Sequence, residues 1–432
     1  MSRRVLASQA EIYVRINIMW DVAVIGGGPA GMMAAGRAGA RGAKVILLEK
    51  NEGLGKKLLI TGGGRCNVTN AEFDNHKLLE KFQTDGKYLF SAFAQWGVKE
   101  TLEFFHTRGM DTKVENELRV FPVSDRAQSV WQVLVDYLRQ NKVEIISGIE
   151  VMGFESRNGI ITSAKLKNGK QIFAKNFILA TGGKSHPETG STGEGFKWLA
   201  KLGHTIINPT ASLVPIKTRE AWVKKLSGVT LQNIKISLFQ NGVRQTKPKL
   251  GKILFTHFGV SGPTILNLSA EVGELLKYGE VIILLDLLPH LNHGALDTAL
   301  QELLTKHHNK MIKNSLGKII IPALVNTVLE LAKIEPEIFC HSLTRETRIT
   351  LGKLLKALPI HVSGLLGEDK AIVTSGGVSL NEINFKTMSS RLIPNLYLVG
   401  DLLNINRPSG GFSLQLCWTT GFVAGNSVPL TI

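Results

Sequence analysis

The sequence predicts an α/β protein in which a mostly parallel sheet, built from both ends of the chain, is interrupted by a separate middle region. Three observations support this fold class. Within residues 21–49 a strand, a glycine-rich turn, a helix and a second strand follow one another. From about residue 190 to 360 the pattern changes to short strands and then to helices. After residue 372 the α/β pattern returns, which indicates that the two ends form one domain around an insertion.

The first two strands, over 21–25 and 44–49, are almost uninterrupted apolar runs, which is typical of a parallel sheet covered on both faces. A helix over about 29–41 connects them. The elements predicted next are amphipathic helices around 76–108 and 125–140 and short strands between 143 and 179.

The middle region divides into two patterns. Residues 205–256 have the spacing of short strands with turns, for example over 229–239, and residues 294–355 have helical apolar spacing, clearest over 295–304 and 321–332. The elements predicted after the insertion are strands over 372–378 and 396–399 and a helix over 411–425.

The chain has 432 residues, of which 44% are hydrophobic, so it can bury more than one core. Lys and Arg number 51 against 35 Asp and Glu, which gives a net charge of +16. Such an excess fits a nucleic-acid partner, an anionic ligand or a basic solvated surface. Because Lys and Arg do not occur in long consecutive runs, a general basic surface is favoured over a nucleic-acid partner.

Three cysteines, Cys66, Cys340 and Cys417, do not form a disulfide framework, and no Cys or His spacing typical of a metal site occurs. The sequence therefore predicts a cytoplasmic protein with reduced thiols and no bound metal. Residues 253–270 and 408–432 lack charge over a membrane-sized length, but both are rich in Gly, Ser, Thr and Asn, so no transmembrane helix is predicted. Nothing in the sequence indicates an oligomeric state.

Gly26, Gly28 and Gly31 match the spacing G-x-G-x-x-G between the first strand and its helix. Gly26 permits a tight turn, Gly28 lets the backbone approach a pyrophosphate, and Gly31 allows the helix to pack closely on the sheet. The start of the helix, at Pro29 and Ala30, offers free N–H groups and a partial positive charge to phosphates. In this context the motif predicts a Rossmann-type dinucleotide site, whereas the string alone also fits an ordinary glycine turn.

Glu49 closes the second strand, 18 residues after Gly31, where its carboxylate can accept hydrogen bonds from ribose hydroxyls. A carboxylate here repels a 2′-phosphate, so FAD or NAD is expected in this site and NADP is not. Asp401 ends a late strand and is a candidate to hold a flavin ribityl hydroxyl; the alternative is a structural Asp in a turn. The helix beginning near Gly411 and Phe412 either points its N-terminus at the flavin or is simply a buried C-terminal helix.

Residues 55–70 form the most unusual segment, in which three glycines precede Arg65, Cys66 and Asn67. Backbone crowded against a ring or a phosphate, with polar donors aimed at it, explains this composition better than a flexible loop. Together with the motifs above, the segment resembles one bacterial family, the BaiN-like and aminoacetone-oxidase-like FAD-dependent oxidoreductases. The segments that share the resemblance are Gly26–Gly31, Glu49, Thr61–Asn70, Ala180–Gly183, Gly190–Gly195, Thr256–Pro263 and Ser375–Gly425.

The resemblance covers about residues 19–428 and implies a Rossmann-type FAD-binding domain with an inserted β-barrel-like domain and a small helical domain. The corresponding predicted boundaries are an N-terminal extension (1–18), the FAD-binding domain (19–190 and 366–432), the β-rich domain (191–290 and 345–365) and the helical domain (291–344). The resemblance implies FAD contacts at Gly28, Pro29, Ala30, Glu49, Lys50, Arg65, Cys66, Asn67, Val151, Ala180, Thr181, Gly182, Asp401, Gly411 and Phe412. Two departures, Gly400–Asn404 where a Gly-Glu-x-x-Asp string is common and Ser413 where Asn is common, leave the substrate unassigned.

The expected function is an FAD-dependent oxidoreductase that transfers a hydride between a small metabolite or NAD(P)H and flavin N5, with oxygen or another acceptor reoxidising the flavin. No catalytic acid or base is assigned, because His186, His204 and His257 each fit a structural role as well. Arg407 is a candidate to bind a carboxylate or another anion; the alternative is an arginine at the surface. A second G-x-G-x-x-G is absent from the sequence, and Cys66 and Cys417 lack the spacing of a redox dithiol. Two alternatives stay open: an RNA-modifying flavoenzyme and a non-catalytic flavin-binding redox sensor.

Overall fold

A computed structural model describes residues 18–367, 371 and 373–430. It contains two compact units, one comprising residues up to 211 and from 371 onward, and the other comprising residues 212–370. The predicted N-terminal extension lies outside the described residues apart from Ile18.

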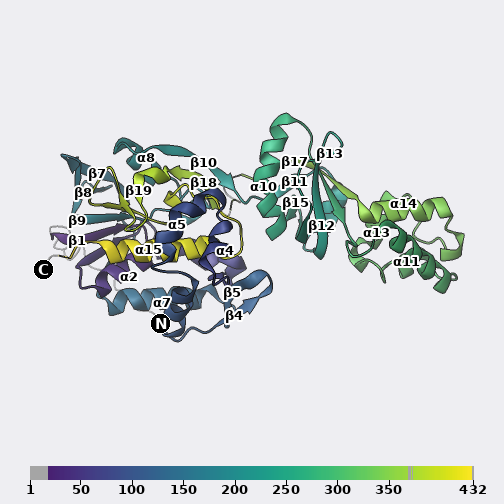
Figure 1. The fold of residues 1–432 in the computed structure, drawn as a ribbon, viewed down its shortest axis with the longest axis horizontal. Coiled ribbons are helices and arrows are strands. Elements are labelled where there is room, and N and C mark those ends of the chain that lie inside the picture. Colours follow the sequence, from purple (N-terminus) through teal and green to yellow (C-terminus); the bar gives the residue numbers. More distant parts are fainter. Residues whose placement is uncertain (1–17, 368–370, 372, 431–432) are drawn as a thin grey trace. The chain divides into compact units, whose positions relative to one another are not determined.

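The first unit is built on a sheet whose central strands are parallel (Figure 1). Along its hydrogen-bonded path the strands are β19 (Ile383–Asn384), β20 (Ser389–Ser390), β21 (Leu396–Leu398), β9 (Gln171–Leu179), β1 (Trp20–Ile25), β2 (Val45–Leu48) and β6 (Glu144–Ile146). In register, Val22 of β1 lies opposite Val45 of β2 and Asn176 of β9. β21 pairs in parallel with β9, with Leu396 opposite Phe177, so both ends of the chain contribute to one sheet.

Two long helices, α2 (Pro29–Ala40) and α15 (Phe412–Ser427), run side by side along this sheet in Figure 1. Their close approach depends on glycine, because a Cβ at Gly421 would lie 2.5 Å from the carbonyl oxygen of Ala30. Most of α15 is buried, which explains why the segment contains no charged residue. α2 also contacts α7 (Ala127–Gln140), whose apolar residues contribute to the same core.

Smaller elements complete the first unit. The remaining helices are α3 (Lys56–Ile60), α4 (Asn75–Glu80), α5 (Gly86–Phe93), α6 (Val98–His106) and α8 (Glu194–Lys201). The remaining strands are β7 (Val151–Arg157) and β8 (Ile160–Leu166), which continue antiparallel from β9, a small sheet of β3 (Thr69–Asn70), β5 (Arg119–Pro122) and β4 (Thr112–Glu115), and the pair β10 (Ile206–Ser212) and β18 (Val373–Val378).

The second unit contains an antiparallel sheet that closes on itself. Its strands are β11 (Ile216–Thr218), β12 (Thr230–Gln240), β13 (Val243–Arg244), β14 (Lys249–Thr256), β15 (Gly259–Ser261), β16 (Ile282–Asp286) and β17 (Leu358–Leu365). The pairings run β12–β14–β15–β11–β17–β16 and return to β12, with β13 as a short addition. This closure removes the exposed edges that an open sheet would present.

Helices complete the second unit. They are α9 (Ala221–Lys225), α10 (Pro263–Leu275), α11 (His293–Lys306), α12 (Ile312–Leu316), α13 (Pro322–Leu331) and α14 (Arg345–Lys356). The barrel and the last four helices share one apolar cluster. A buried ion pair also joins them, since Lys356 Nζ on α14 lies 2.8 Å from Asp286 Oδ2 on β16. Lys356 also donates to the carbonyl oxygens of Leu288 and Leu291, so its charge is well compensated.

The predicted fold class is confirmed: a Rossmann-type sheet made from both ends of the chain, with an inserted barrel and helices. The predicted domain boundaries stay predictions, and the compact units change at 211/212 and 370/371. The sequence missed α10, since the region was interpreted only as buried and uncharged. No helix in the described part of the chain has the length and apolar character needed to cross a membrane.

Candidate cofactor site

A pocket in the first unit lies at the carboxyl ends of four parallel strands. It is lined by Ile25 at the end of β1, Leu48 at the end of β2, Ala180 after β9 and Val399 after β21. The N-terminal turns of α2 and α15 contribute to the same pocket. Ligands of open α/β sheets bind at such a place, where the strand ends and helix starts converge.

Most of the residues predicted to bind the cofactor line this pocket. They are Gly26, Gly28, Pro29, Ala30, Glu49, Lys50, Val151, Ala180, Thr181, Gly182 and Asp401. Of the described residues, the other predicted ones do not line it; they are Gly31, Arg65, Cys66, Asn67, Gly411 and Phe412. Asn51 and Lys57 also line the pocket and were not indicated by the sequence, and so does Ser413, which the sequence indicates only as a departure from the family pattern.

Glycine is required at the three motif positions for different physical reasons. A Cβ at Gly26 would lie 2.4 Å from the carbonyl oxygen of Ala180, and one at Gly31 would lie 1.9 Å from that of Gly26. Both positions therefore exclude a side chain because of the protein's own backbone. A Cβ at Gly28 would meet nothing within 4 Å, and its φ of −77° is accessible to any residue. Gly28 thus leaves open space in the pocket at the uncapped start of α2.

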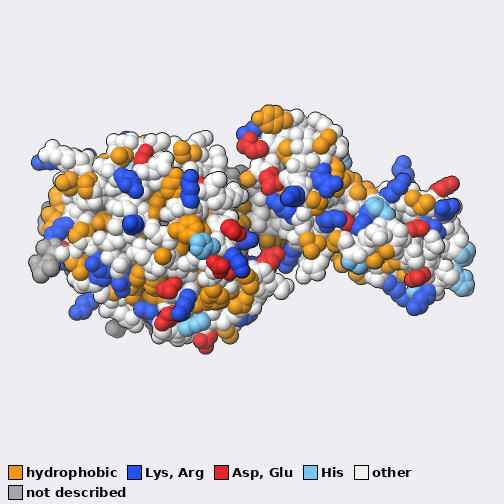
Figure 2. Space-filling model, viewed as in Figure 1, with side chains coloured by type: hydrophobic (Ala, Val, Ile, Leu, Met, Phe, Trp, Pro, Cys, Tyr) orange, Lys and Arg blue, Asp and Glu red, His pale blue; other side chains and the backbone are white. Residues whose placement is uncertain are grey.

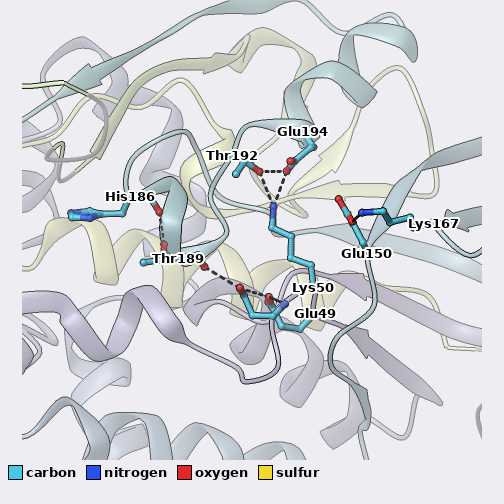
Figure 3. Close-up of polar contacts among 9 residues, drawn as sticks. Glu49, Lys50, Glu150, Lys167, His186, Thr189, Thr192 and Glu194 are labelled. Carbon is cyan, nitrogen blue, oxygen red and sulfur yellow. Dashed lines mark hydrogen bonds and ion pairs between the residues drawn. The ribbon is translucent and has the colours of Figure 1, made fainter.

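Glu49 is buried and held from several directions (Figure 3). Its Oε2 accepts from the Gly27 N–H at 2.7 Å, and its Oε1 accepts from the Asn51 N–H at 2.8 Å and from Asn51 Nδ2 at 2.7 Å. Asn51 Nδ2 also donates to the carbonyl oxygen of Thr189 at 3.0 Å. The carboxylate is therefore fixed beside the glycine turn, and Asn51 connects it to the loop that precedes α8.

Lys50 makes a second connection to that loop (Figure 3). Its Nζ donates to Thr192 Oγ1 at 2.7 Å and to Glu194 Oε2 at 3.0 Å. Burial alone would raise the pKa of Glu194, but hydrogen bonds from Thr192 and Lys50 outweigh it and lower that pKa. The contacts of Lys50 and Asn51 thus hold the loop against the end of β2, on one side of the pocket.

Another residue that lines the pocket, Asp401, is paired with two cations. Arg407 Nη2 contacts its Oδ1, and Lys57 Nζ lies 3.6 Å from its Oδ2. Burial acts to raise the pKa of Asp401, but the charges of Arg407 and then Lys57 lower it overall, so the carboxyl is ionised. Arg407 is buried, which excludes the surface position considered for it, and it also donates to Ser413 Oγ and to the carbonyl oxygen of Ile405.

Arg65 points to a pair of acidic residues. It forms ion pairs with Glu115 and Asp125, and its guanidinium lies 4.1 Å from the centre of the Phe121 ring. The hydrogen bonds that the guanidinium donates to Glu115 and Asp125 raise the pKa of Arg65. Its contact with a cofactor stays a prediction.

The glycine-rich segment nevertheless reaches the start of α15. A Cβ at Gly411 would lie 2.4 Å from the carbonyl oxygen of Thr69, so the two backbones touch. Thr69 Oγ1 donates to Gln415 Oε1 at 2.6 Å, and the Trp418 ring N–H donates to the Val68 carbonyl oxygen at 2.9 Å. The segment therefore positions the N-terminal turn of α15, whose Ser413 lines the pocket.

Two buried oxygen atoms on residues predicted to bind the cofactor have no hydrogen-bond partner among the described residues: Thr181 Oγ1 and Asn67 Oδ1. A buried polar atom left unpaired is costly, and a bound ligand is a common reason for one. Thr181 lines the pocket, and Asn67 lies in the glycine-rich segment.

The two cysteines considered for redox chemistry are buried thiols. Burial raises the pKa of Cys66 to about 12. Burial, followed by the charge of Asp401, raises the pKa of Cys417 to about 12 as well. Both are therefore protonated near neutral pH and poorly nucleophilic, which argues against a dithiol mechanism.

The three histidines considered for catalysis differ in the contacts they make. His204 is buried, with Nδ1 2.8 Å from Glu382 Oε2 and Nε2 3.0 Å from Ser390 Oγ. Ser390 Oγ also accepts from two backbone N–H groups, so this chain of contacts is a closed structural network. His186 Nδ1 lies 2.7 Å from Glu188 Oε1, and His257 belongs to the second unit. None of the three lines the pocket in the described part of the chain.

The model of the family described as the HI0933-like protein Rossmann domain matches residues 20–427. The 3-dehydro-bile acid delta(4,6)-reductase of Clostridium scindens is 32% identical over 411 residues, 94% of this chain and 98% of the relative. The ribosomal RNA dihydrouridine synthase of Escherichia coli is 27% identical over 421 residues, 95% of this chain and 98% of the relative.

Solved structures share the fold at low sequence identity. A flavocytochrome c3 fumarate reductase in its open conformation is 16% identical, with a TM-score of 0.54, over 98% of this chain and 80% of that one. The 3-ketosteroid delta1-dehydrogenase of Sterolibacterium denitrificans is 13% identical, with a TM-score of 0.55, over 95% of this chain and 99% of that one. At this identity the likeness concerns the fold alone.

Proposed function

The chain belongs to the HI0933-like family of FAD-dependent oxidoreductases, and from this premise we propose that it reduces a carbon–carbon double bond conjugated to a carbonyl group in a small molecule. The family membership confirms the resemblance identified in the sequence and the predicted class of enzyme. The substrate, the electron donor and the residues that bind each of them are the proposal.

One observation carries the proposal: a single pocket joins the glycine turn and Glu49 from the N-terminal part of the chain to Asp401 and Ser413 from the C-terminal part. A dinucleotide is long enough to use both sides of such a pocket, with its diphosphate between them. The open space at Gly28 and the unpaired Thr181 Oγ1 fit a bound FAD, since neither is explained by contacts within the protein.

In this proposal each pocket residue has a definite task toward FAD. The free N–H groups at the start of α2 bind the diphosphate, and Glu49 accepts from the ribose hydroxyls of the adenosine. Asp401, held ionised by Arg407 and Lys57, accepts from hydroxyl groups on the flavin side. The start of α15 presents its positive end to the flavin ring. When bound, FAD supplies the two-electron chemistry, and the protein orients it and excludes water.

The substrate class rests on the relatives. One relative is named as a delta(4,6)-reductase of a 3-dehydro-bile acid and another as a ribosomal RNA dihydrouridine synthase. The delta-4 double bond of a 3-oxo steroid and the double bond that distinguishes uridine from dihydrouridine are each conjugated to a carbonyl group. We extend that chemistry to this chain, where the double bond gains a hydride at one carbon and a proton at the other. NADH or NADPH provides the hydride and is oxidised to NAD(P)⁺, and solvent provides the proton.

An anaerobic titration tests the proposal. The purified protein is loaded with FAD, and bleaching of the flavin near 450 nm is recorded after addition of NADH, NADPH or an amine panel including aminoacetone. A conjugated enone, such as a 3-oxo-4-ene steroid, is then added to the reduced protein. We expect a nicotinamide to bleach the flavin and the enone to restore its colour with formation of the saturated product. Bleaching by amines and by no nicotinamide would instead indicate an amine oxidase.

A second candidate is reduction of uridine in RNA. Two relatives named ribosomal RNA dihydrouridine synthase, from Escherichia coli and Haemophilus influenzae, are each 27% identical to the chain. The net charge of +16 is also suited to a polyanionic substrate. In the same titration, recovery of flavin colour with ribosomal RNA but with no enone, together with dihydrouridine detected by mass spectrometry, would favour this candidate.

A further inference from the structure

An exposed patch of lysines and aromatic rings lies on the helical part of the second unit. We call it the Lys-aromatic patch; its members are Lys306, His308, Lys310, Lys318, Phe339 and His341. Figure 2 shows Lys, Arg and His side chains spread over this helical part. The patch is separate from the cofactor pocket, because no member lines that pocket in the described part of the chain.

Backbone contacts bring the two segments of the patch together. The Cys340 N–H donates to the Lys310 carbonyl oxygen at 2.9 Å, and the His341 N–H donates to the His308 carbonyl oxygen at 3.2 Å. His341 Nδ1 also lies 2.7 Å from that carbonyl oxygen. The loop after α11 and the turn before α14 therefore lie side by side, with their relative position fixed by hydrogen bonds.

The aromatic part of the patch is an exposed, nearly parallel stack. The rings of Phe339 and His341 have centroids 5.6 Å apart and an interplanar angle of 9°. Phe339 is 45% exposed, although a phenyl ring is among the side chains most often buried. A flat ring that is held in place and accessible to solvent is the geometry on which a nucleobase stacks.

The basic part of the patch lacks the acidic partners found nearby. In the same helical part, Lys313 Nζ lies 2.7 Å from Glu337 Oε1, and Arg348 Nε lies 2.8 Å from Asp297 Oδ1. By contrast, no described carboxylate lies within ion-pair distance of Lys306, Lys310 or Lys318.

These three lysines share one neighbourhood, around His307. Lys318 Nζ lies 3.0 Å from His307 Nε2. Burial lowers the pKa of His307, and the charges of Lys318, Lys310 and Lys306 lower it further, so all three lysines act on the same imidazole. The neutral ring accepts a hydrogen bond from Lys318, and three uncompensated positive charges remain on the surface.

We propose that the Lys-aromatic patch binds single-stranded nucleic acid, with a base stacked on Phe339 and His341 and phosphates bound by Lys306, Lys310 and Lys318. Unpaired lysines beside an exposed ring supply the two interactions that such binding requires, charge toward the backbone and a face for the base. A membrane surface would require a broad apolar face, whereas the patch offers one aromatic stack. The binding does not use flavin, so it does not depend on the function proposed above.

Fluorescence anisotropy of the full chain loaded with FAD tests this proposal, using fluorescein-labelled 12-nucleotide uridine and thymidine oligomers at 50 to 200 mM salt. The triple variant K306Q/K310Q/K318Q removes the three charges. Its matched control, K224Q/K225Q/K353Q, removes three exposed lysines elsewhere in the same unit. We expect the patch variant to bind at least about tenfold more weakly and to lose about 2 from the slope of log K against log salt, since each phosphate contact contributes ~0.7.

A second variant, F339L, tests the stack separately, because leucine keeps apolar bulk but offers no ring. We expect it to bind the oligomers about fivefold more weakly with little change in salt slope, since stacking is not ionic. Thermal unfolding of each variant establishes that it is folded. Comparing the uridine and thymidine oligomers shows whether the patch binds RNA or DNA more tightly.

Three results would overturn the proposal. One is equal weakening by the patch variant and its control, which would indicate a diffuse charge effect. Another is unchanged binding by both the patch variant and F339L. The third is no binding of either oligomer at 50 mM salt while vesicles of phosphatidylglycerol and phosphatidylcholine bind, which would make the patch a membrane-docking surface.

Discussion

Replacing Gly28 by alanine separates the needs of the cofactor from the needs of the fold. The new Cβ would meet no protein atom within 4 Å, and the φ of −77° suits alanine. It would, however, project from the turn that lines the pocket, where we place the diphosphate of FAD. We therefore expect G28A to fold normally and to bind FAD poorly.

The magnitudes follow from opposing effects. Alanine at a position of compatible φ gains about 0.4–1 kcal/mol by restricting the unfolded chain, whereas alanine in place of glycine at a helix N-cap loses a similar amount. The net change in stability should thus be within about 0.5 kcal/mol of zero. Loss of one hydrogen bond to a charged phosphate costs about 1.5–3 kcal/mol, which weakens FAD binding about tenfold to a hundredfold.

Two neighbouring glycines provide the controls. A Cβ at Gly53 also meets nothing within 4 Å, but Gly53 does not line the pocket, so G53A should bind FAD normally. A Cβ at Gly31 would lie 1.9 Å from the carbonyl oxygen of Gly26, so G31A should unfold at a clearly lower temperature. Circular dichroism of the apoprotein measures stability, and quenching of flavin fluorescence measures binding. Normal FAD affinity in G28A, or destabilisation comparable with G31A, would refute the reasoning.

Further predictions concern the charged and thiol groups of the pocket. E49Q should weaken FAD binding about tenfold, measured by the same fluorescence titration, because a charge-assisted acceptor is lost; unchanged affinity would remove Glu49 from the site. D401N should lower stability by about 3–5 kcal/mol, since Arg407 is left buried without its partner, and removing both charges in D401N/R407L should recover part of the loss. The pKa of Asp401 is lowered on folding, so the ionised carboxylate stabilises the folded protein above about pH 4, its unfolded pKa. This stabilisation is lost as the pH falls through the folded pKa. Thermal unfolding as a function of pH should show this acid-dependent component in the wild type and not in D401N. With pKa values of about 12, Cys66 and Cys417 should resist iodoacetamide at pH 8 in the native protein and react in urea, as followed by mass spectrometry; rapid native labelling would contradict their burial.

The parts of the fold that the sequence predicts are those fixed by local pattern. The helix predicted over 29–41 is α2 (Pro29–Ala40), and the strand predicted over 396–399 is β21 (Leu396–Leu398). Both depend on apolar runs bounded by glycine or proline, which a short window of sequence contains. The glycine motif is recognised from the same kind of short window. The structural reason for glycine at position 26, however, is the carbonyl oxygen of Ala180, which is far along the chain and leaves no room for a Cβ.

Contacts between residues far apart in the sequence could not be predicted from local sequence patterns. No spacing indicates that Lys57 approaches Asp401, because the two residues come from opposite ends of the chain. The closure of the barrel between β12 and β16 likewise depends on pairing that strand propensity does not specify. α10 was missed because its segment begins with Pro263 inside a run rich in Gly, Ser and Thr, composition that is typical of a loop.

The glycine-rich segment shows why a distinctive motif does not identify its own contacts. Its Arg65 is predicted to contact the cofactor, and this stays a prediction; in the structure the guanidinium pairs with Glu115 and Asp125 and lies over the Phe121 ring. The backbone of the segment and Thr69 also contact Gly411 and Gln415 at the start of α15. Because that helix start borders the pocket, the spacing of the segment influences the cofactor site even where its side chains do not line it. A motif at an α/β site can therefore be specific in part because it positions a second element.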